Sequence, residues 1–229
     1  MSLQARAERS VAKRLRSPGR RSGVEAARTR ARLLRAAERL FARKGYNATS
    51  LRELASVSGV RMFTIHHHFG SKQRLYEEVL QRWHEDVQEL VDRILAETDD
   101  PQRAVERSVQ ELFDFFLAQR DRVALNARAA LGEGLPRRLD SAERGWVRFM
   151  GSAMTSHRLA APGLDIGLLL ITLEGILHNH VLAVSHYRHL FGRDVTDPEM
   201  AARTKQHLAR VILALVGPAA GERRNSARR

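Results

Sequence analysis

Apolar side chains recur every three to four residues along most of this chain, and this spacing limits its possible folds more than any other feature. Such a period places the apolar residues on one face of an α-helix. Nowhere do apolar and polar residues alternate as they do in a half-buried strand, and no segment repeats at an interval of 20–50 residues. The sequence therefore predicts an all-α fold of about nine helices.

Glycine, proline and serine divide the pattern into separate helices. Ser50 and Glu53 form a capping box, and Ser71 is placed to cap the helix that starts near Lys72. Gly45 is expected to end the helix before it in a left-handed conformation. The expected helices cover 25–44, 51–58, 61–67, the segment from 72 to the Asp99-Asp100-Pro101 break, 101–119, 121–131, 139–158, 164–190 and 197–216.

Positive charge is concentrated at the amino-terminal end. Residues 1–24 hold seven basic residues and one acidic residue, and residues 25–82 hold twelve and five, so these segments carry net charges of +6 and +7. Residues 83–220 carry −3, and residues 221–229 carry +3. A basic head on a slightly acidic body is typical of a nucleic-acid-binding module joined to a module with another task. An arginine-rich composition alone would not produce this asymmetry.

Composition argues against several other classes of protein. The chain has no cysteine, which rules out disulfides, thiolate zinc sites and a cysteine nucleophile. No uncharged run reaches 18 apolar residues, and the first 24 residues lack the apolar core of a secretory signal, so a cytoplasmic location is expected. We also find no phosphate-cradling glycine loop, no Gly-x-Ser-x-Gly elbow and no metal-ligand spacing. We therefore expect neither an enzyme nor a bound cofactor or metal.

Residues 51–68 have the pattern of a helix-turn-helix, in which the second helix enters the major groove of DNA. Ala55 and Gly59 are small enough to let the two helices cross closely. Phe63 and Ile65 are expected in the core rather than between bases. Consecutive helical residues point about 100° apart, so the three adjacent histidines do not suit one metal ion. The residues expected to pin the second helix are Leu54, Val57, Val60, Ile65 and Phe69, and those expected to project from it are Arg61, Thr64, His66, His67 and His68.

The amino-terminal third also resembles a known family. The resemblance is carried, in order, by LLRAAERLF at 33–41, GYNATS at 45–50, ELA at 53–55, Gly59-Val60 and HFGSK at 68–72. Together these motifs are similar to the N-terminal domain of the tetracycline-repressor (TetR) family, over about residues 28–80. Beyond length and helical content, the resemblance does not extend into residues 85–229. It implies a homodimeric one-component transcription regulator, whose head binds operator DNA and whose variable body binds a small molecule.

The resemblance also implies which residues contact DNA. These are Thr49, Ser50, Arg52, Arg61, Met62, Thr64, His66, His67 and Lys72. Three positions depart from the family pattern. Arg61 stands where a capping serine is frequent, Phe63 where a small residue is frequent, and His66 where a tyrosine usually contacts phosphate. An arginine at position 61 can instead bond a guanine through two hydrogen bonds.

The body is expected to supply a dimer interface and a pocket. Segment 164–190 is apolar on more than one face and needs partners on several sides. By resemblance it would pair with the final helix and their copies across a two-fold axis, through Leu169, Ile176, His180, Leu208, Val211, Ile212 and Leu215. The residues that either line an effector pocket or form a plain core are Phe113, Phe116, Leu117, Leu125, Trp146, Phe149, Met150, Met154, Leu173, Glu174, Leu177 and His178.

Polar residues in the apolar segment 164–190 leave alternatives open. Glu174 and His178 lie one turn apart and share a helix face. They either satisfy each other across a dimer, line a pocket and orient a ligand, or serve a metal or catalytic site, for which no third ligand is evident.

These features predict four segments: a flexible basic arm at 1–24, a helix-turn-helix domain at 25–72, an effector-binding and dimerisation domain at 73–217 and a basic tail at 218–229. The arm either contacts DNA or is an incidental tail. The expected function is a homodimeric regulator, a repressor, which binds a near-palindromic operator and is released by a small, largely apolar effector. The alternative is a basic architectural or effector-independent DNA-binding protein. The expected partners are duplex DNA, the effector and a second copy, with no membrane.

Overall fold

The computed structural model describes residues 18–132, 140–157, 159 and 164–216, and every regular element in these ranges is an α-helix. This confirms the all-α prediction. The helices are α2 (Pro18–Ala48), α3 (Leu51–Ser58), α4 (Met62–Phe69), α5 (Lys72–Ala96), α6 (Pro101–Ala118), α7 (Arg120–Ala130), α8 (Asp140–Ser156), α9 (Ile166–Leu182), α10 (Val184–Phe191) and α11 (Pro198–Val216).

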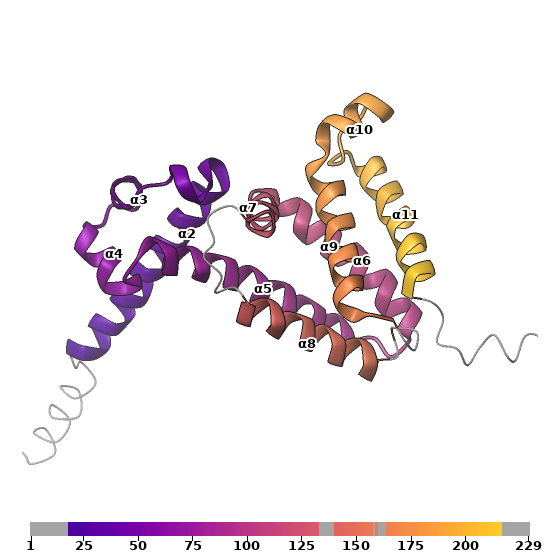
Figure 1. The fold of residues 1–229 in the computed structure, drawn as a ribbon, viewed down its shortest axis with the longest axis horizontal. Helices are drawn as coiled ribbons and strands as arrows, with labels where there is room; N and C mark the ends of the chain where they lie inside the picture. The colour runs from indigo at the N-terminus through magenta and orange to yellow at the C-terminus, as the bar shows by residue number, and fades with distance from the viewer. Residues whose placement is uncertain (1–17, 133–139, 158, 160–163, 217–229) are drawn as a thin grey trace, which may run out of the picture.

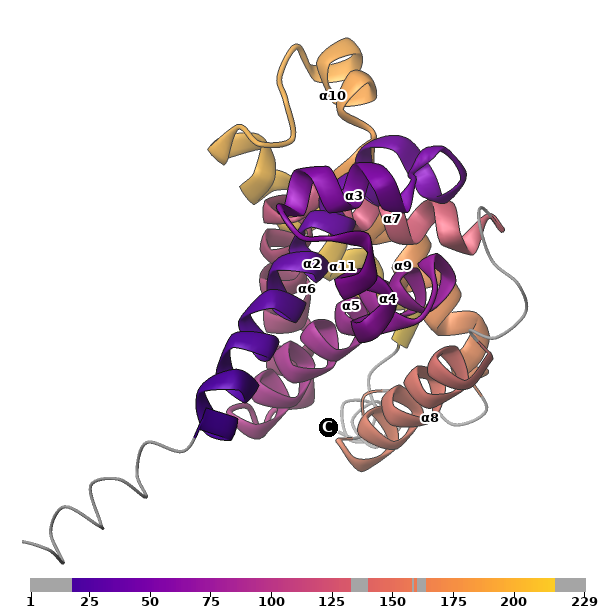
Figure 2. The same cartoon turned by 90° about the vertical axis from the view of Figure 1, so that its left-hand side faces the viewer.

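The helices form a head and a body, joined by α5 and α7 (Figure 1). The head consists of α2, α3 and α4, and the body contains α6, α8, α9, α10 and α11. Seen from the head end, α3 and α4 lie in front of the body helices (Figure 2). Helix α5 runs from the head into the body, and α7 packs against both α2 and α9.

The head has its own apolar core. Helix α2 contributes Leu33, Ala36, Ala37, Leu40 and Phe41, which is the stripe expected from their spacing. Tyr46 packs back onto this core, with its ring centroid 4.9 Å from that of Tyr76 in α5. Leu125 and Ala129 complete the head core from α7. The head is therefore closed in part by a helix that lies far along the sequence.

The body core is larger. Its members on α5 are Trp83, Val87, Val91 and Leu95, which recur every fourth residue and face α6. Helices α6, α9 and α11 add further buried residues, and Val123 joins from α7. Because α5 and α7 each contribute to both cores, the chain offers no clean division at the expected boundary of residue 72.

Helix α2 begins earlier than expected. The sequence placed residues 18–24 in a flexible arm, whereas the helix starts at Pro18. Proline suits the first turn of a helix, because the N–H that it lacks would have no partner there. Gly45 interrupts α2 as predicted, although its φ of 78° and ψ of 171° are not those of the left-handed helical conformation. The rest of the expected arm, residues 1–17, and the expected tail lie outside the described residues.

The predicted helix at 164–190 is wrong as a single element. It is two helices, α9 and α10, that meet at Ala183 with an angle of 66° between them. No glycine or proline marks this bend. Tyr187 in α10 contacts His180 in α9 and Thr204 in α11 through its hydroxyl, at 2.6 and 3.1 Å. These contacts between helices, rather than local sequence, favour the bend.

Within the described residues, none of the helices taken singly has the length and apolar character needed to cross a membrane. The bent pair α9–α10 meets that criterion only when its two helices are counted together.

Candidate DNA-binding face and effector cavity

Helix α3 and its turn hold α4 in place. The Ser50 hydroxyl accepts from the Glu53 N–H at 3.1 Å and so caps α3, as predicted. The reciprocal half of the capping box is replaced, because Glu53 accepts from the Lys44 ammonium at 2.6 Å. At the other end, Gly59 is left-handed, with φ 64° and ψ 29°, and the Val60 N–H donates to the Ala55 carbonyl at 3.1 Å. This sharp turn lets α4 start at Met62.

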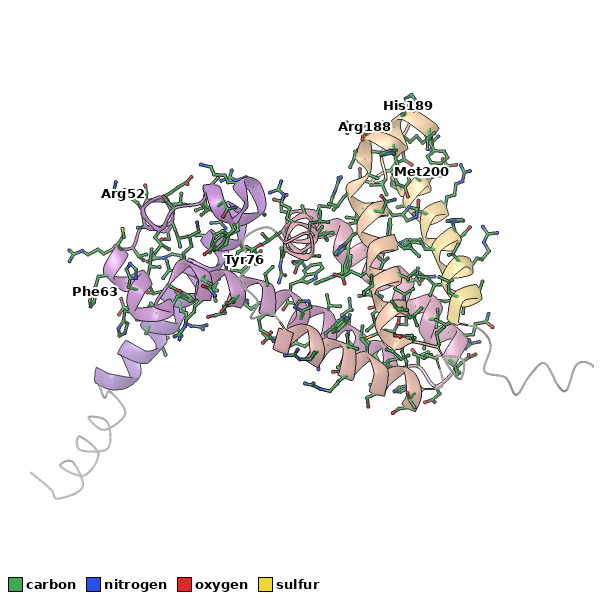
Figure 3. All side chains as sticks on the ribbon, in the orientation of Figure 1. Arg52, Phe63, Tyr76, Arg188, His189 and Met200 are labelled. Carbon is green, nitrogen blue, oxygen red and sulfur yellow. The ribbon has the colours of Figure 1, made fainter. Side chains whose placement is uncertain are left out.

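Helix α4 has one buried and one outward face. Ile65 and Phe69, four residues apart, are buried in the head core together with Leu54 of α3. Met62, Phe63, His66 and His67 are exposed on the other face, and Arg61 is exposed at the helix start. Figure 3 shows Phe63 and Arg52 at the free end of the head, pointing away from the body. The buried Ile65 and Phe69 thus fix α4 so that its other face, with Arg61, His66 and His67, is exposed to solvent.

The expected core positions are only partly correct. Leu54, Ile65 and Phe69 are buried and Val60 is half-buried, as predicted. Phe63 is 79% exposed and Val57 is also exposed, so both predictions are wrong. The reason is helical phase: Ile65 takes the inward position, and Phe63, two residues earlier, points about 200° away from it.

The expected DNA-contacting residues fall into two groups. Arg52, Arg61, Met62, His66 and His67 have exposed side chains at the free end of the head, while Thr64 is half-buried. Thr49 needs correction as a contact residue, because its side chain is buried and its hydroxyl donates to the Gly45 carbonyl at 2.8 Å. It holds the turn before α3. Ser50 is exposed, but its hydroxyl is used by the cap.

His66 and Lys72 make local contacts at the edges of this face. His66 Nδ1 lies 3.0 Å from the Gly70 carbonyl oxygen and therefore donates to it. The Lys72 ammonium lies 4.2 Å from the centroid of the Tyr46 ring and 3.5 Å from the Asn47 carbonyl. Partial burial lowers the pKa of Lys72 from its ordinary value. The ammonium is thus fixed beside the start of α5, where Ser71 caps the helix by accepting from the Arg74 N–H at 3.2 Å.

Residues 33–79 match the family of bacterial regulatory proteins named after TetR, a match that includes α3, the turn and α4. These residues therefore form a DNA-binding domain of the TetR type. It is 25% identical over 119 residues to the transcriptional repressor NicS of Pseudomonas putida, covering 51% of this chain and 56% of NicS. It is 36% identical over 86 residues to the transcriptional activator FasR of Mycolicibacterium smegmatis, covering 38% of this chain and 39% of FasR. The chain thus spans about half the length of these curated relatives.

Solved structures extend the likeness to the whole fold. The regulator FadR from Bacillus subtilis, in complex with stearoyl-CoA, superposes with a TM-score of 0.64 at 13% identity, covering 82% of this chain and 99% of FadR. A putative TetR-family regulator from Shewanella superposes with a TM-score of 0.62 at 18% identity, covering 80% and 95% of the two chains. The likeness in fold therefore includes the helical body.

A cavity of about 130 Å³ lies within the body, between α5, α6, α8, α9 and α11. Seven of the twelve expected residues line it: Phe116, Trp146, Met150, Met154, Leu173, Glu174 and Leu177. Phe113 and Leu125 are buried in the body and head cores respectively, and Leu117, Phe149 and His178 are not among the lining residues. These five predictions are corrected, because an inward helical position does not by itself border a cavity.

Sequence reasoning missed the α5 wall of the cavity and, apart from Phe116, the α6 wall. Trp83, Val87, Val91 and Leu95 form the α5 wall, and their spacing of four residues was the available signal. The polar lining residues are His84, Ser108 and Glu174, and among the described residues no lysine or arginine lines the cavity. Burial is the main effect on His84 and lowers its pKa, which favours the neutral imidazole.

Of the two histidines of α9, His180 has a hydrogen-bond partner within the chain, whereas the buried Nε2 of His178 has none. His178 Nε2 lies 3.7 Å from Glu174 Oε1, too far for a hydrogen bond, and burial lowers the pKa of His178 to about 4. Its ring lies 5.7 Å from that of Phe116. His180 is instead bonded to Tyr187. In the described part of the chain, no three His, Asp or Glu side chains are grouped closely enough to hold a metal ion.

The expected interface residues are mostly internal. Leu169, Leu208 and Ile212 are buried in the body core, so a second chain cannot reach them, and these predictions are corrected. Ile176, Val211 and His180 are half-buried, and Leu215 is exposed. The outward apolar side chains of α9 are instead Leu168 and Ile171, which are 65% and 70% exposed.

Proposed function

We propose that this TetR-family protein is a DNA-binding transcription regulator that acts as a homodimer and responds to a small, largely apolar effector. One observation carries the proposal: α4 is anchored by Ile65 and Phe69 and turns a face with Arg61, His66 and His67 to solvent. A helix of this width fits the major groove, and its cationic neighbours suit the phosphate backbone.

The exposed apolar face of α9 supports a homodimer. Leu168 and Ile171 share this face with Thr172 and Gly175, and the adjacent α11 exposes Leu215. Such apolar side chains are expected to be buried by a partner, and a second copy buries the same face on both subunits. A two-fold dimer would present two α4 helices to half-sites roughly 34–36 Å apart.

The cavity supports the effector part of the proposal and limits its chemistry. Its wall is mostly apolar, with two tryptophans, and the described residues that line it include no lysine or arginine. An acidic ligand would leave its charge unpaired there, at a substantial desolvation cost. We infer a neutral, largely apolar effector. By this criterion the effector differs from the acyl-CoA present in the Bacillus subtilis structure.

Helix α7 supplies a route from the cavity to the head. The Arg122 guanidinium lies 5.2 Å from the centroid of the Trp83 ring, which lines the cavity. The same side chain pairs with Asp86 of α5 at 2.6 Å and with Glu38 of α2 at 3.4 Å. An effector that displaces Trp83 would therefore disturb contacts that fix the head. We propose that the operator-binding form is a repressor that occludes promoter DNA, and that the effector favours a released form by binding it more tightly.

The first experiment selects binding sites from random duplex DNA at about 150 mM salt, where non-specific attraction is weak. We expect a near-palindrome, with affinity lowered about 5- to 150-fold in Arg61→Ala, since one bidentate arginine–guanine contact is worth about 1–3 kcal/mol. Arg103→Ala, on an exposed side chain of the body, is the matched control and should bind like the wild type. Binding without sequence preference that disappears as salt rises would instead support the architectural alternative.

A separate assay tests whether the cavity binds the effector. Trp83 and Trp146 are the only tryptophans of the chain, and both line the cavity, so ligand binding should change intrinsic fluorescence. We expect neutral apolar compounds that change this fluorescence to release the selected duplex. Ser108→Leu, which places extra volume in the cavity, should abolish both effects while the protein still binds DNA. Release that persists unchanged in this variant would contradict the assignment of the cavity.

A further inference from the structure

The side chain of Phe63 in α4 does not pack into the core of the head. Phe63 is 79% exposed, although burial of a phenylalanine normally stabilises a fold. Its ring stacks on the imidazole of His67, one turn on, with centroids 6.3 Å apart and planes inclined by 16°. Met62, the preceding residue, is 41% exposed. The result is a small apolar patch, Met62 and Phe63, on a helix face that is otherwise polar.

The surroundings of this patch specify an anionic partner. Arg61 adjoins it in sequence, and Arg52 and Phe63 point outward from the same end of the head (Figure 3). An anionic lipid surface and duplex DNA both satisfy this charge. A helix that binds a membrane surface buries a continuous apolar face, whereas the inner face of α4 is used by the head core and only two apolar residues remain outside. The arrangement favours DNA.

The major groove offers few apolar groups for such a patch to contact. Its floor carries hydrogen-bond donors and acceptors, and its apolar feature is the C5-methyl group of thymine. 5-Methylcytosine carries a methyl group at the same ring position. A phenylalanine cannot read the hydrogen-bonding pattern of a base edge, but it can desolvate a methyl group.

We propose that Phe63, flanked by Met62, reads the C5-methyl group of a pyrimidine in each half-site. This inference rests on the proposed DNA-binding function and adds the chemical group that one side chain recognises. Because Phe63 stands outside the head core, it contributes to specificity without a role in folding.

The test uses the selected duplex with each thymine replaced in turn by deoxyuridine, which removes the methyl group and keeps every hydrogen-bonding group. We expect the wild type to lose affinity about fourfold for each methyl group removed at one position per half-site. Phe63→Ala should bind less tightly, and should no longer distinguish thymine from deoxyuridine at that position. Leu131→Ala removes another exposed apolar side chain, in the residue after α7, and should retain full sensitivity.

A second arm separates the two sources of the methyl group. A cytosine–guanine pair at the same position should weaken wild-type binding, and 5-methylcytosine should restore about the same fourfold. Thermal unfolding of Phe63→Ala should match the wild type, so that any loss of binding is not a loss of fold.

Several outcomes would overturn the inference. Indifference of the wild type to every deoxyuridine, or retained sensitivity in Phe63→Ala, would remove Phe63 as the reader while leaving DNA binding intact. Phe63-dependent binding to phosphatidylserine vesicles, or a Phe63-dependent change of oligomeric state, with no thymine preference would assign the patch to another partner. Failure to select any duplex would overturn the proposed function, and this inference with it.

Discussion

His178 lies in surroundings that penalise its charged form. The ring is buried against Phe116, and its Nε2 has no hydrogen-bond partner. The carboxylate of Glu174, 3.7 Å away, is half-exposed and does not offset the burial, so the pKa falls to about 4. The imidazole is therefore neutral in the folded protein at any pH near neutrality.

This burial predicts how stability depends on pH. The unfolded chain binds a proton at His178 below about pH 6.5, whereas the folded protein does so only near pH 4, so stability is lost as the pH falls between these values. At pH 5 the loss from this group is roughly 2 kcal/mol in the free energy of unfolding. Urea unfolding of His178→Gln should show a weaker pH dependence by about that amount.

The control for this measurement is His189, an exposed residue of α10 (Figure 3). His189→Gln should keep the wild-type pH dependence. Equal slopes for His178→Gln and the wild type between pH 7 and pH 5 would contradict the assignment.

Single residues also show where sequence reasoning stops. Ser50 was predicted as a cap from its neighbours alone, because a cap is a local interaction. Thr49, the adjacent residue, was misplaced, since its burial depends on the irregular backbone at Gly45. Phe63 and Ile65 are both apolar, and only the phase of α4 against the head core distinguishes them.

Among the elements, α7 carries the contacts between head and body. It places Leu125 and Ala129 in the head core and Val123 in the body core. Arg128 also donates to the Ala42 carbonyl of α2 at 3.0 Å. A helix held by both cores transmits a displacement from one to the other, because neither can repack without it.

Arg122 is the residue in which this coupling should be measured. In Arg122→Met, the pairs with Asp86 and Glu38 and the stacking on Trp83 are lost, so we expect thermal unfolding to show a loss of about 1–3 kcal/mol. Under the proposed function, the effector concentration needed to release DNA should also rise by about fivefold or more. Fluorescence titration and DNA release measure the two effects separately.

The matched control is Arg103→Met, which removes an exposed arginine with only a long contact to Asp100, at 3.9 Å. Stability and release should both stay at wild-type values. If Arg122→Met lowered stability but left release unchanged, Arg122 would be a structural residue and not part of the coupling.

The elements were predictable to the extent that their ends are encoded locally. The limits of α3 follow from Ser50 and Gly59, and those of α6 from Asp100 and Pro101 at its start. The break between α9 and α10 was missed, because Tyr187 stabilises it through His180 and Thr204 on other helices. Contacts between distant segments leave no such mark in the local sequence.

At the scale of the whole molecule, the outward face of α9 predicts how two copies meet. Ile171 is 70% exposed in one chain and would be buried by the partner's α9 in the proposed dimer. Ile171→Asp places like charges near each other across the two-fold axis, so we expect the dimer dissociation constant to rise by about 100-fold or more. Sedimentation velocity over a range of protein concentrations measures this change.

Leu131→Asp provides the comparison, because Leu131 is at least as exposed but lies outside α9 and α11. It should leave the oligomeric state unchanged. A monomeric wild type, or an Ile171→Asp dimer as tight as the wild type, would require a different interface.

The cavity shows the limit of prediction at this scale. Helical spacing identified residues such as Phe116, Met150 and Met154 as inward-facing, and they do line the cavity. Phe113 faces inward in the same helix as Phe116 but packs fully against its neighbours. Whether an inward residue borders empty space depends on how five helices fit together, and spacing within one helix contains no information about that.

The shared helices also bear on how such proteins exchange parts during evolution. The segment matched to the family ends at residue 79, yet Leu80 and, far along the chain, Leu125 and Ala129 complete the head core. A head grafted onto a foreign body at residue 72 would lose the apolar side chains of α5, and a graft after residue 80 would still rely on the host's α7. We therefore expect a transplanted head to fold only where the α7 of the recipient fills the same space, so that the head and this one helix of the body would have to be exchanged together.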